Sequence, residues 1–162
     1  MAYVLVAAAM AATCVVETVW PTALFWGGER PELLVAVVMT TAVAYGSRLG
    51  LVAGFMAAFW RGPLEHHAWG GLFVAYMAVG LLGGLVGHRL LVRRALAAAP
   101  AALVAAVLFR VLLLIFQPPS ALGLWLLGTF HAVVYTMLLA VPLHALVLWA
   151  QGEVHHAWTP WR

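Results

Sequence analysis

Long apolar stretches, separated by short breaks of charged residues, proline or glycine, constrain the fold of this chain more than any other feature. Residues 122–149, for example, contain no Arg, Lys, Asp or Glu. A helix of about 20 apolar residues crosses the hydrocarbon core of a bilayer. Only 8% of the chain is charged and 66% is hydrophobic, whereas soluble domains are about 25% charged. A polar surface could not cover such a globule, so we expect lipid to surround it.

The breaks divide the chain into six predicted helices: residues 3–20, 31–45, 49–60, 69–91, 97–116 and 122–149. The sequence therefore predicts an all-α membrane protein with about six transmembrane helices in one bundle. This domain covers residues 1–150, and residues 151–162 form a short cytoplasmic tail. The second and third helices are shorter than the roughly 20 residues that span a bilayer. Because no cation precedes Arg30, we expect the first helix to be a retained span rather than a signal peptide.

The distribution of arginine predicts the orientation. With the N-terminus in the cytoplasm, the outer loops hold only Arg30 and Arg61. The inner loops and the tail then hold the other loop arginines, which are Arg48, Arg89, Arg93, Arg94 and Arg162. Arginine and lysine accumulate on the cytoplasmic side of membrane proteins. We therefore expect a multi-pass protein of the bacterial inner membrane with both termini inside.

Small residues recur at helical spacing in three of the predicted helices. The residues concerned are Gly46, Gly50 and Gly54 in and before the third helix, Gly80 and Gly84 in the fourth, and Ala7 and Ala11 in the first. Small residues four apart form a smooth strip that lets another helix backbone approach closely. Packing within the chain is the favoured interpretation, and docking of a partner helix is the alternative.

Two charged residues fall inside predicted spans, both toward the outer side. Glu17 lies near the end of the first helix, and Arg110 lies about two turns before the end of the fifth. An unpaired charge in lipid is costly, so such residues usually pair or face water. We expect Glu17 and Arg110 to form a pair or to share an outer cavity. The alternative is that Arg110 extends its side chain outward to the interface.

The residue types present exclude most catalytic schemes. The chain contains no Lys and no Asp, which removes Schiff-base chemistry and an aspartyl dyad. Adjacent histidines at His66 with His67 and at His155 with His156 fall on opposite sides of the membrane, so we expect no metal site and no cofactor. The scattered arginines form no basic face, so nucleic acid is not an expected partner. The sequence indicates a protein that is not an enzyme.

Short landmarks carry a resemblance to a known family. The first helix ends in the polar Glu17, Pro21 lies in the link, and Gly54 belongs to a glycine-punctuated third helix. The second helix begins with Arg30, Pro31, Glu32, Leu33 and Leu34. In this order the chain resembles the MreD family of rod shape-determining membrane proteins. It departs from the family at Gly62, where relatives carry an acidic residue, and Glu65 is a possible substitute.

The resemblance implies a non-enzymatic scaffold of the bacterial cell-elongation complex, acting in rod-shape determination and peptidoglycan synthesis. Its expected partners are a bitopic protein similar to MreC, membrane lipid and wall-synthesis enzymes. Self-association into a homo-oligomer is left as an alternative. The family fold is similar to that of the substrate-binding membrane subunit of energy-coupling-factor vitamin transporters. Such a transport subunit, with an outward pocket near Glu17 and Arg110, is the alternative function. The short outer loops offer few hydrogen-bonding groups for a vitamin.

Overall fold

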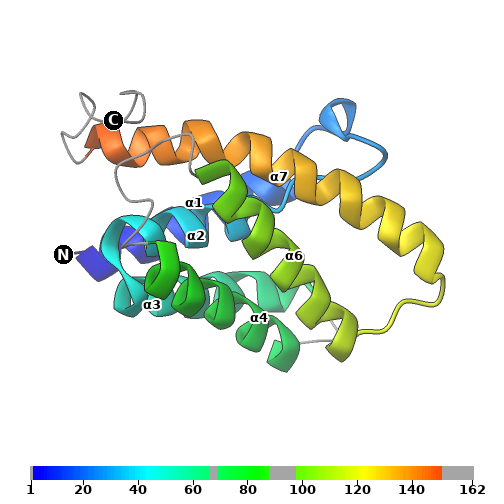
Figure 1. Cartoon of the computed structure of the whole chain (residues 1–162), viewed down its shortest axis with the longest axis horizontal. Coiled ribbons are helices and arrows are strands. Elements are labelled where there is room, and N and C mark those ends of the chain that lie inside the picture. The colour runs from blue at the N-terminus through cyan, green and yellow to red at the C-terminus, as the bar shows by residue number, and fades with distance from the viewer. Residues whose placement is uncertain (1, 66–68, 88–97, 151–162) are drawn as a thin grey trace.

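The computed structural model describes residues 2–65, 69–87 and 98–150, and these residues form helices and connecting loops without a β-strand. The α-helices are α1 (Ala2–Thr18), α2 (Leu33–Tyr45), α3 (Ser47–Arg61), α4 (Trp69–Leu82), α6 (Ala98–Phe116) and α7 (Leu122–Ala150). Two 3-10 helices, η1 (Thr22–Leu24) and η2 (Gly62–Leu64), lie in loops, and a π-helical turn, η3 (Gly83–Gly87), continues α4. The all-α prediction is confirmed for this part of the chain (Figure 1).

The helix boundaries follow the glycine and proline breaks. Between α2 and α3, Gly46 has a φ of 86°, a conformation that glycine adopts without steric penalty. The predicted third helix, residues 49–60, is observed as Ser47–Arg61. The predicted end of the fourth helix at residue 91 lies outside the described residues. So do the tail, the paired histidines His66, His67, His155 and His156, and the arginines Arg89, Arg93, Arg94 and Arg162.

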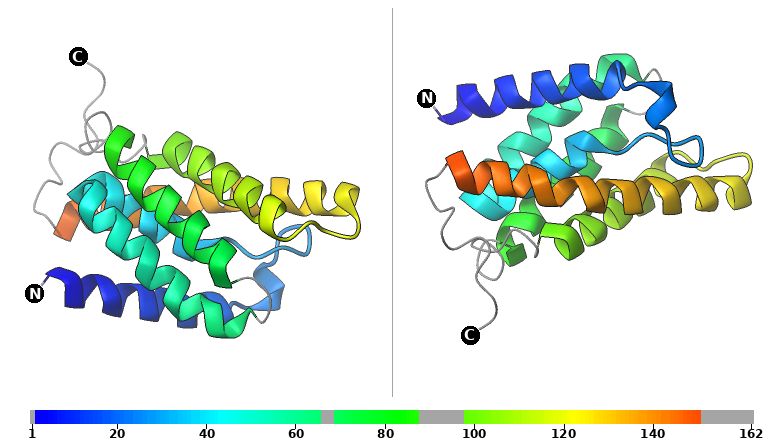
Figure 2. Two further views of the ribbon diagram at one scale, coloured as in Figure 1. Left: turned by 90° about the horizontal axis from the view of Figure 1, so that it is seen from below. Right: turned by 90° about the horizontal axis from the view of Figure 1, so that it is seen from above.

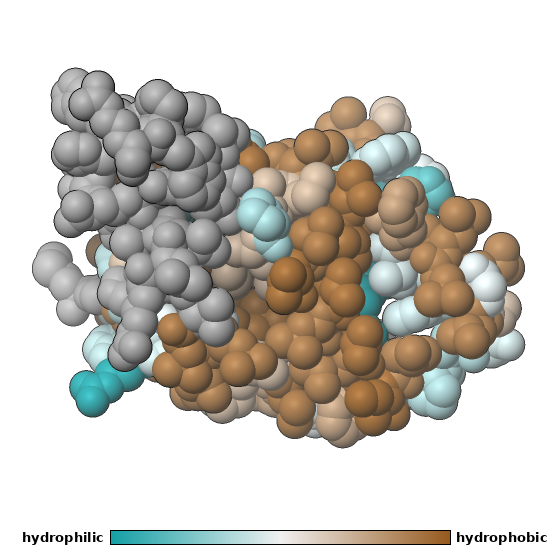
Figure 3. Space-filling model, viewed as in Figure 1, coloured by the Kyte–Doolittle hydropathy of each residue, from teal (hydrophilic) through white to brown (hydrophobic). Residues whose placement is uncertain are grey.

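Two described helices are long and apolar enough to cross a membrane. They cover Ala98–Phe116, with 19 residues, and Leu122–Trp149, with 28 residues. The helical segments Tyr3–Thr18, Leu33–Tyr45 and Trp69–Leu85 are apolar but shorter. Apolar side chains also cover much of the face formed by α4, α6 and α7 (Figure 3).

Helix α2 lies at the centre of the bundle. It contacts α1, α3, α4, α6 and α7, and nearly all of its side chains are buried. Figure 2 shows α1 along one edge of the molecule and α7 running beside α2, with the start of α7 extending past the ends of the shorter helices. A central helix that is apolar on every side needs such a cover on every side. The end of α1, the start of α2 and the end of α3 meet in one region, where Arg61 contacts Glu17 and Glu32.

Glycines bring α3 and α4 into backbone contact. A Cβ atom at Gly50 would collide with the carbonyl oxygen of Gly80, and one at Gly80 would collide with that of Gly50. Gly54 faces the carbonyl group of Tyr76 in the same way, and Gly84 faces the backbone of Ser47. These strips are occupied within the chain, so they offer no room for the partner helix that was the alternative interpretation.

Candidate functional site: a buried ionic cluster

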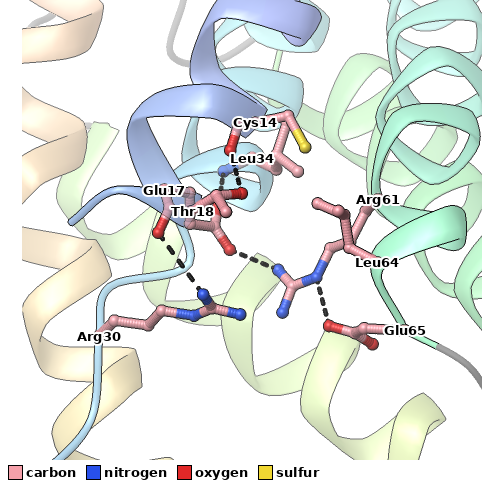
Figure 4. Close-up of a pocket in the computed structure, with 8 residues that line it drawn as sticks. All are labelled: Cys14, Glu17, Thr18, Arg30, Leu34, Arg61, Leu64 and Glu65. Carbon is pink, nitrogen blue, oxygen red and sulfur yellow. Dashed lines mark hydrogen bonds and ion pairs between the residues drawn. The ribbon is translucent and has the colours of Figure 1, made fainter.

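Seven charged side chains gather where α1 and α3 end and α2 begins. We call this group the ionic cluster; it consists of Glu17, Glu29, Arg30, Glu32, Arg61, Glu65 and Arg110. They come from α1, the loop before α2, the end of α3, the residue after η2, and α6. Figure 4 shows part of the cluster, with Arg30 and Arg61 extending toward the Glu17 side chain from opposite sides. The sequence thus brings together ionic groups that are distant along the chain.

Arg61, the last residue of α3, is the centre of this cluster. Its Nη1 atom lies 2.6 Å from Glu17 Oε1 and 2.7 Å from Glu32 Oε2. The same nitrogen lies 3.0 Å from the hydroxyl oxygen of Tyr76 in α4. Its Nε donates to Glu65 Oε1 at 2.6 Å. The guanidinium therefore joins α1, the start of α2, α4 and the residue that follows η2. Buried charges of this kind are tolerated because they are paired.

The second oxygen of Glu17 is bound as well. Its Oε2 accepts a hydrogen bond from the backbone N–H of Leu34 at 3.0 Å. Leu34 lies in the first turn of α2, where backbone N–H groups have no acceptor within the helix. Glu17 thus supplies an acceptor for α2 from α1, while its other oxygen pairs with Arg61. One carboxylate fixes three helices relative to one another.

Glu32 bridges two arginines immediately before α2. Its Oε2 pairs with Arg61, and its Oε1 lies 2.7 Å from Arg110 Nη2 in α6. Its backbone N–H donates to the hydroxyl of Thr136 in α7 at 2.9 Å. Glu29 lies farther from Arg110, at 3.7 Å between Oε2 and Nη2, and its side chain is 38% exposed. The start of α2 is therefore fastened to α3, α6 and α7.

The observed ion pairs differ from the predicted one. Glu17 pairs with Arg61, and Arg110 pairs with Glu32 and Glu29, so the structure does not bring Glu17 and Arg110 together directly. Arg61 and Glu32 lie between them. The direct pair was wrong because Arg61 was assigned to an outer loop, whereas it completes the last turn of α3 and points into the bundle.

The family-like landmarks have unequal places in the cluster. Glu32 and Pro31 are buried, Arg30 is half-buried, and Pro21 is exposed at the start of η1. Gly62, the position that departs from the family, lies beside the ring of Trp69. Glu65, three residues later, supplies a carboxylate to Arg61. An acidic group therefore does reach the end of α3, from the residue after the 3-10 helix rather than from position 62.

Two cavities open onto the ionic cluster. The first has a volume of about 220 Å³ and is lined by Glu17, Arg30, Arg61 and Glu65, with Cys14, Thr18, Leu34 and Leu64. The second has a volume of about 250 Å³, and Arg110, Glu29, Glu32, Gln117 and Trp125 are among the residues that line it. Arg30, Arg61 and Glu65 line both. Glu17 and Arg110 thus face two neighbouring cavities rather than one shared cavity.

Sequence reasoning missed three members of this region. Arg61 was treated as a loop residue, and Tyr76 and Thr136 were not singled out, although the cluster binds both. A signal was present, because every charged residue between positions 17 and 65 except Arg48 lies at the same predicted end of the bundle. Tyr76 and Thr136 lie within apolar helices, and only the packing shows which way they point.

The cluster offers four glutamates and three arginines, and all of them except Arg30 are joined by ion pairs within the cluster. Among the residues that the structure describes, no three His, Cys, Asp or Glu side chains are arranged to hold a metal ion. Comparisons with models of protein families, with curated proteins and with solved structures found no match. The geometry of the cluster and the surface of the bundle therefore carry the functional argument.

Proposed function

We propose that this chain is a six-span membrane scaffold of the MreD type, which holds the transmembrane helix of a bitopic, MreC-like partner in the bacterial cell-elongation complex. It lies in the inner membrane with both termini in the cytoplasm and carries out no reaction of its own. The observation that carries the proposal is the mutual pairing of the ionic cluster. Its charges link helices to each other, so they serve to fix the bundle.

The pairing distances support a positioning role. Arg61 is within 2.7 Å of both Glu17 and Glu32, and Glu32 is within 2.7 Å of Arg110. A group that acts on a substrate needs a free position where a reacting atom can lie. Here the most buried charged groups are already ion-paired with one another, so they leave no such free position. A bundle fixed in this way presents a constant surface to a partner helix.

The outer face of α1 supports helix docking. Leu5, Ala9, Ala12 and Val16 are exposed, and their spacing of four, three and four places them on one side of the helix. We call these residues the α1 face. It has small residues in its middle and larger ones at its ends, a pattern that lets a second helix approach closely. Ala7 and Ala11, the predicted strip, are half-buried and lie to the side of this face.

The cavities argue against the transport alternative. Pockets that enclose a small molecule of drug or vitamin size have volumes of about 300–1,000 Å³. The two charged cavities measure about 220 and 250 Å³, and paired side chains line them. A vitamin would have to break several of these ion pairs to enter. The scaffold therefore fits the geometry better.

Affinity purification from crosslinked membranes tests the scaffold. The unaltered chain should co-purify a single-span protein with a coiled-coil outer segment, and Ala12→Phe should reduce its recovery because the new ring projects from the α1 face. Val104→Phe is the matched control, since Val104 is exposed on α6. Equal recovery from both variants, or co-purification of ATPase subunits or a tightly bound vitamin, would contradict the proposal.

The proposed topology has a separate test. Cys14 is the only cysteine in the sequence, so Cys14→Ala provides a cysteine-free background. Single cysteines are then placed at Ser47, the first residue of α3, and at Ser120, between α6 and α7. An impermeant maleimide applied to the outside of intact spheroplasts should label position 120 and spare position 47. Labelling of both from one side would contradict six spans.

A further inference from the structure

We propose that the cavity beside Arg30 and the apolar groove next to it form one binding site for a zwitterionic phospholipid. The phosphate group lies on Arg30, the amine of the headgroup faces Glu65, and an acyl chain follows the groove along α1. This inference uses the membrane placement but is independent of the proposed partner. A phosphatidylethanolamine molecule has the required chemistry.

The first observation is the guanidinium of Arg30. Arg61 and Arg110 are each paired with carboxylates, whereas no ion pair joins Arg30 to a carboxylate of the described residues. Its hydrogen bond to the carbonyl oxygen of Glu17 is long, at 3.5 Å from Nη1. Figure 4 shows this guanidinium at the cavity, directed toward Arg61. A planar guanidinium with free donors binds phosphate oxygens in a bidentate manner.

The charge balance favours a zwitterion over an anion. The cluster holds four glutamates against three arginines, so an added anion would increase an existing excess of negative charge. Glu65 uses Oε1 for Arg61, and its side chain is 27% exposed at the cavity. An ammonium group can reach it while the phosphate contacts Arg30. A headgroup with both charges therefore matches the cavity better than phosphatidylglycerol.

The second observation is an apolar groove that joins the charged cavity. The groove has a volume of about 310 Å³ and lies between α1 and the end of α3, with Ala11, Val15, Val19 and Trp60 in its wall. Cys14, Thr18 and Leu64 line both the groove and the 220 Å³ cavity. The cavity and the groove therefore lie next to each other. A charged recess beside an apolar groove has the polarity that an amphiphile requires.

The position of Trp60 indicates where the headgroup region of the bound lipid would lie. Trp60 precedes Arg61, is 42% exposed and lines the groove. Tryptophan side chains prefer the boundary between hydrocarbon and headgroups. A lipid whose phosphate lies beside Arg30 and Arg61 therefore has its glycerol region near Trp60 and its acyl chain directed along α1. Another polypeptide helix would fill the groove but would leave the Arg30 guanidinium without an ion-pair partner.

Native mass spectrometry of the detergent-purified full chain, titrated with phosphatidylethanolamine or phosphatidylglycerol, tests this site. The chain should bind phosphatidylethanolamine preferentially. Arg30→Gln should weaken that binding about tenfold or more, because hydrogen bonds to charged groups are the stronger ones. Arg48→Gln is the matched control, since Arg48 is exposed in the first turn of α3 at the other end of that helix, and it should leave binding unchanged.

The groove is tested on α1 itself. Ala11→Phe and Val15→Phe should each reduce phosphatidylethanolamine binding, and Val15 is exposed, so its variant tests the groove if Ala11→Phe fails to fold. Ala12→Phe, one position along the helix on the α1 face, should reduce partner recovery but not lipid binding. Equal binding of both lipids, or binding that Arg30→Gln leaves unchanged, would overturn the site. If the unaltered chain binds phosphatidylethanolamine but recovers no single-span partner, only the scaffold proposal is contradicted.

Discussion

Helix α3 is held at its two ends by opposite means. Along its first turns it lies against α4 through Gly50 and Gly54, where the lack of side chains lets backbone meet backbone. At its last residue, Arg61, a long charged side chain reaches several partners. The glycine contact tolerates no added atom because its neighbours are backbone. At the ionic end, Arg61 has several carboxylate partners that differ in burial. These partners should therefore differ in how much they contribute to stability.

This difference separates a contact that depends on fit from one that depends on charge balance. In the ionic cluster, the exposed rim and the buried centre should respond unequally to loss of a charge. In the glycine contact, every position that faces backbone should respond strongly to gain of a methyl group. Four substitutions, measured as changes in the free energy of unfolding in mixed detergent, test this distinction.

Arg61→Met should have the largest effect. It leaves Glu17 and Glu32 buried without their shared cation, and breaking a buried ion pair costs about 3–5 kcal/mol. The control is Arg48→Met at the exposed start of α3, which should change the free energy of unfolding little. A loss below about 1 kcal/mol for Arg61→Met would mean that water or an added ion replaces the guanidinium.

Gly80→Ala should follow, with a loss near the upper end of the 1–3 kcal/mol that overpacking costs, about 3 kcal/mol. The new methyl group meets the carbonyl group of Gly50, which cannot rotate away. Gly70→Ala in the same helix is the control, because no atom lies within 4 Å of the added group. It should be neutral or slightly stabilising. Similar losses in both variants would show that helix propensity, not contact with α3, sets the effect.

Thr136→Val should cost about 1–2 kcal/mol. The hydroxyl of Thr136 accepts the backbone N–H of Glu32, and valine leaves that buried donor without its acceptor. Thr136→Ser keeps the oxygen and should retain most of the stability. Amide hydrogen exchange at the start of α2 adds a local measurement, which should become faster in the valine variant only. Unchanged exchange there would show that the Thr136 hydroxyl does not stabilise the start of α2.

Glu65→Gln should have the smallest effect, below about 1 kcal/mol. Its carboxylate lies at the rim, where its side chain is 27% exposed, and Arg61 keeps Glu17 and Glu32 as partners. Glu32→Gln is the informative comparison, because Glu32 is buried between two arginines and its loss should cost several times more. Equal losses of stability in Glu65→Gln and Glu32→Gln would show that burial within the cluster does not determine how much a carboxylate contributes.

Much of the helical framework could be predicted from the sequence. Gly46 and Pro118 lie at two of the predicted breaks, and the observed helix bounds agree with these breaks. The four-residue spacing from Gly50 to Gly54 and from Gly80 to Gly84 also predicted close helix contacts. It did not predict that these glycines would face each other, because the rotation of α3 about its axis depends on the residues around it. That rotation is what leaves no glycine surface there for a partner.

The ionic cluster was harder to predict, because pairing depends on direction as well as depth. Glu17 and Arg110 have similar predicted depths, yet each has a nearer partner from the ends of neighbouring helices. Arg61 follows Trp60 and precedes Gly62 and Pro63, a setting that is typical of a loop. The sequence thus indicates the end of α3 to within one residue. It does not indicate that the Arg61 side chain points into the bundle, where its carboxylate partners lie.

The unequal lengths of the outer helices have a consequence for the surrounding bilayer. At 1.5 Å per residue, the 15 residues of α3 extend about 22 Å, and the 29 residues of α7 extend about 43 Å. In the proposed placement, the hydrocarbon layer must thin beside α3 and either thicken or meet a tilted helix beside α7. Such hydrophobic mismatch costs fractions of a kcal/mol per ångström. The protein would thus carry a step in membrane thickness with it, and neighbouring proteins with short spans would gather on its α3 side.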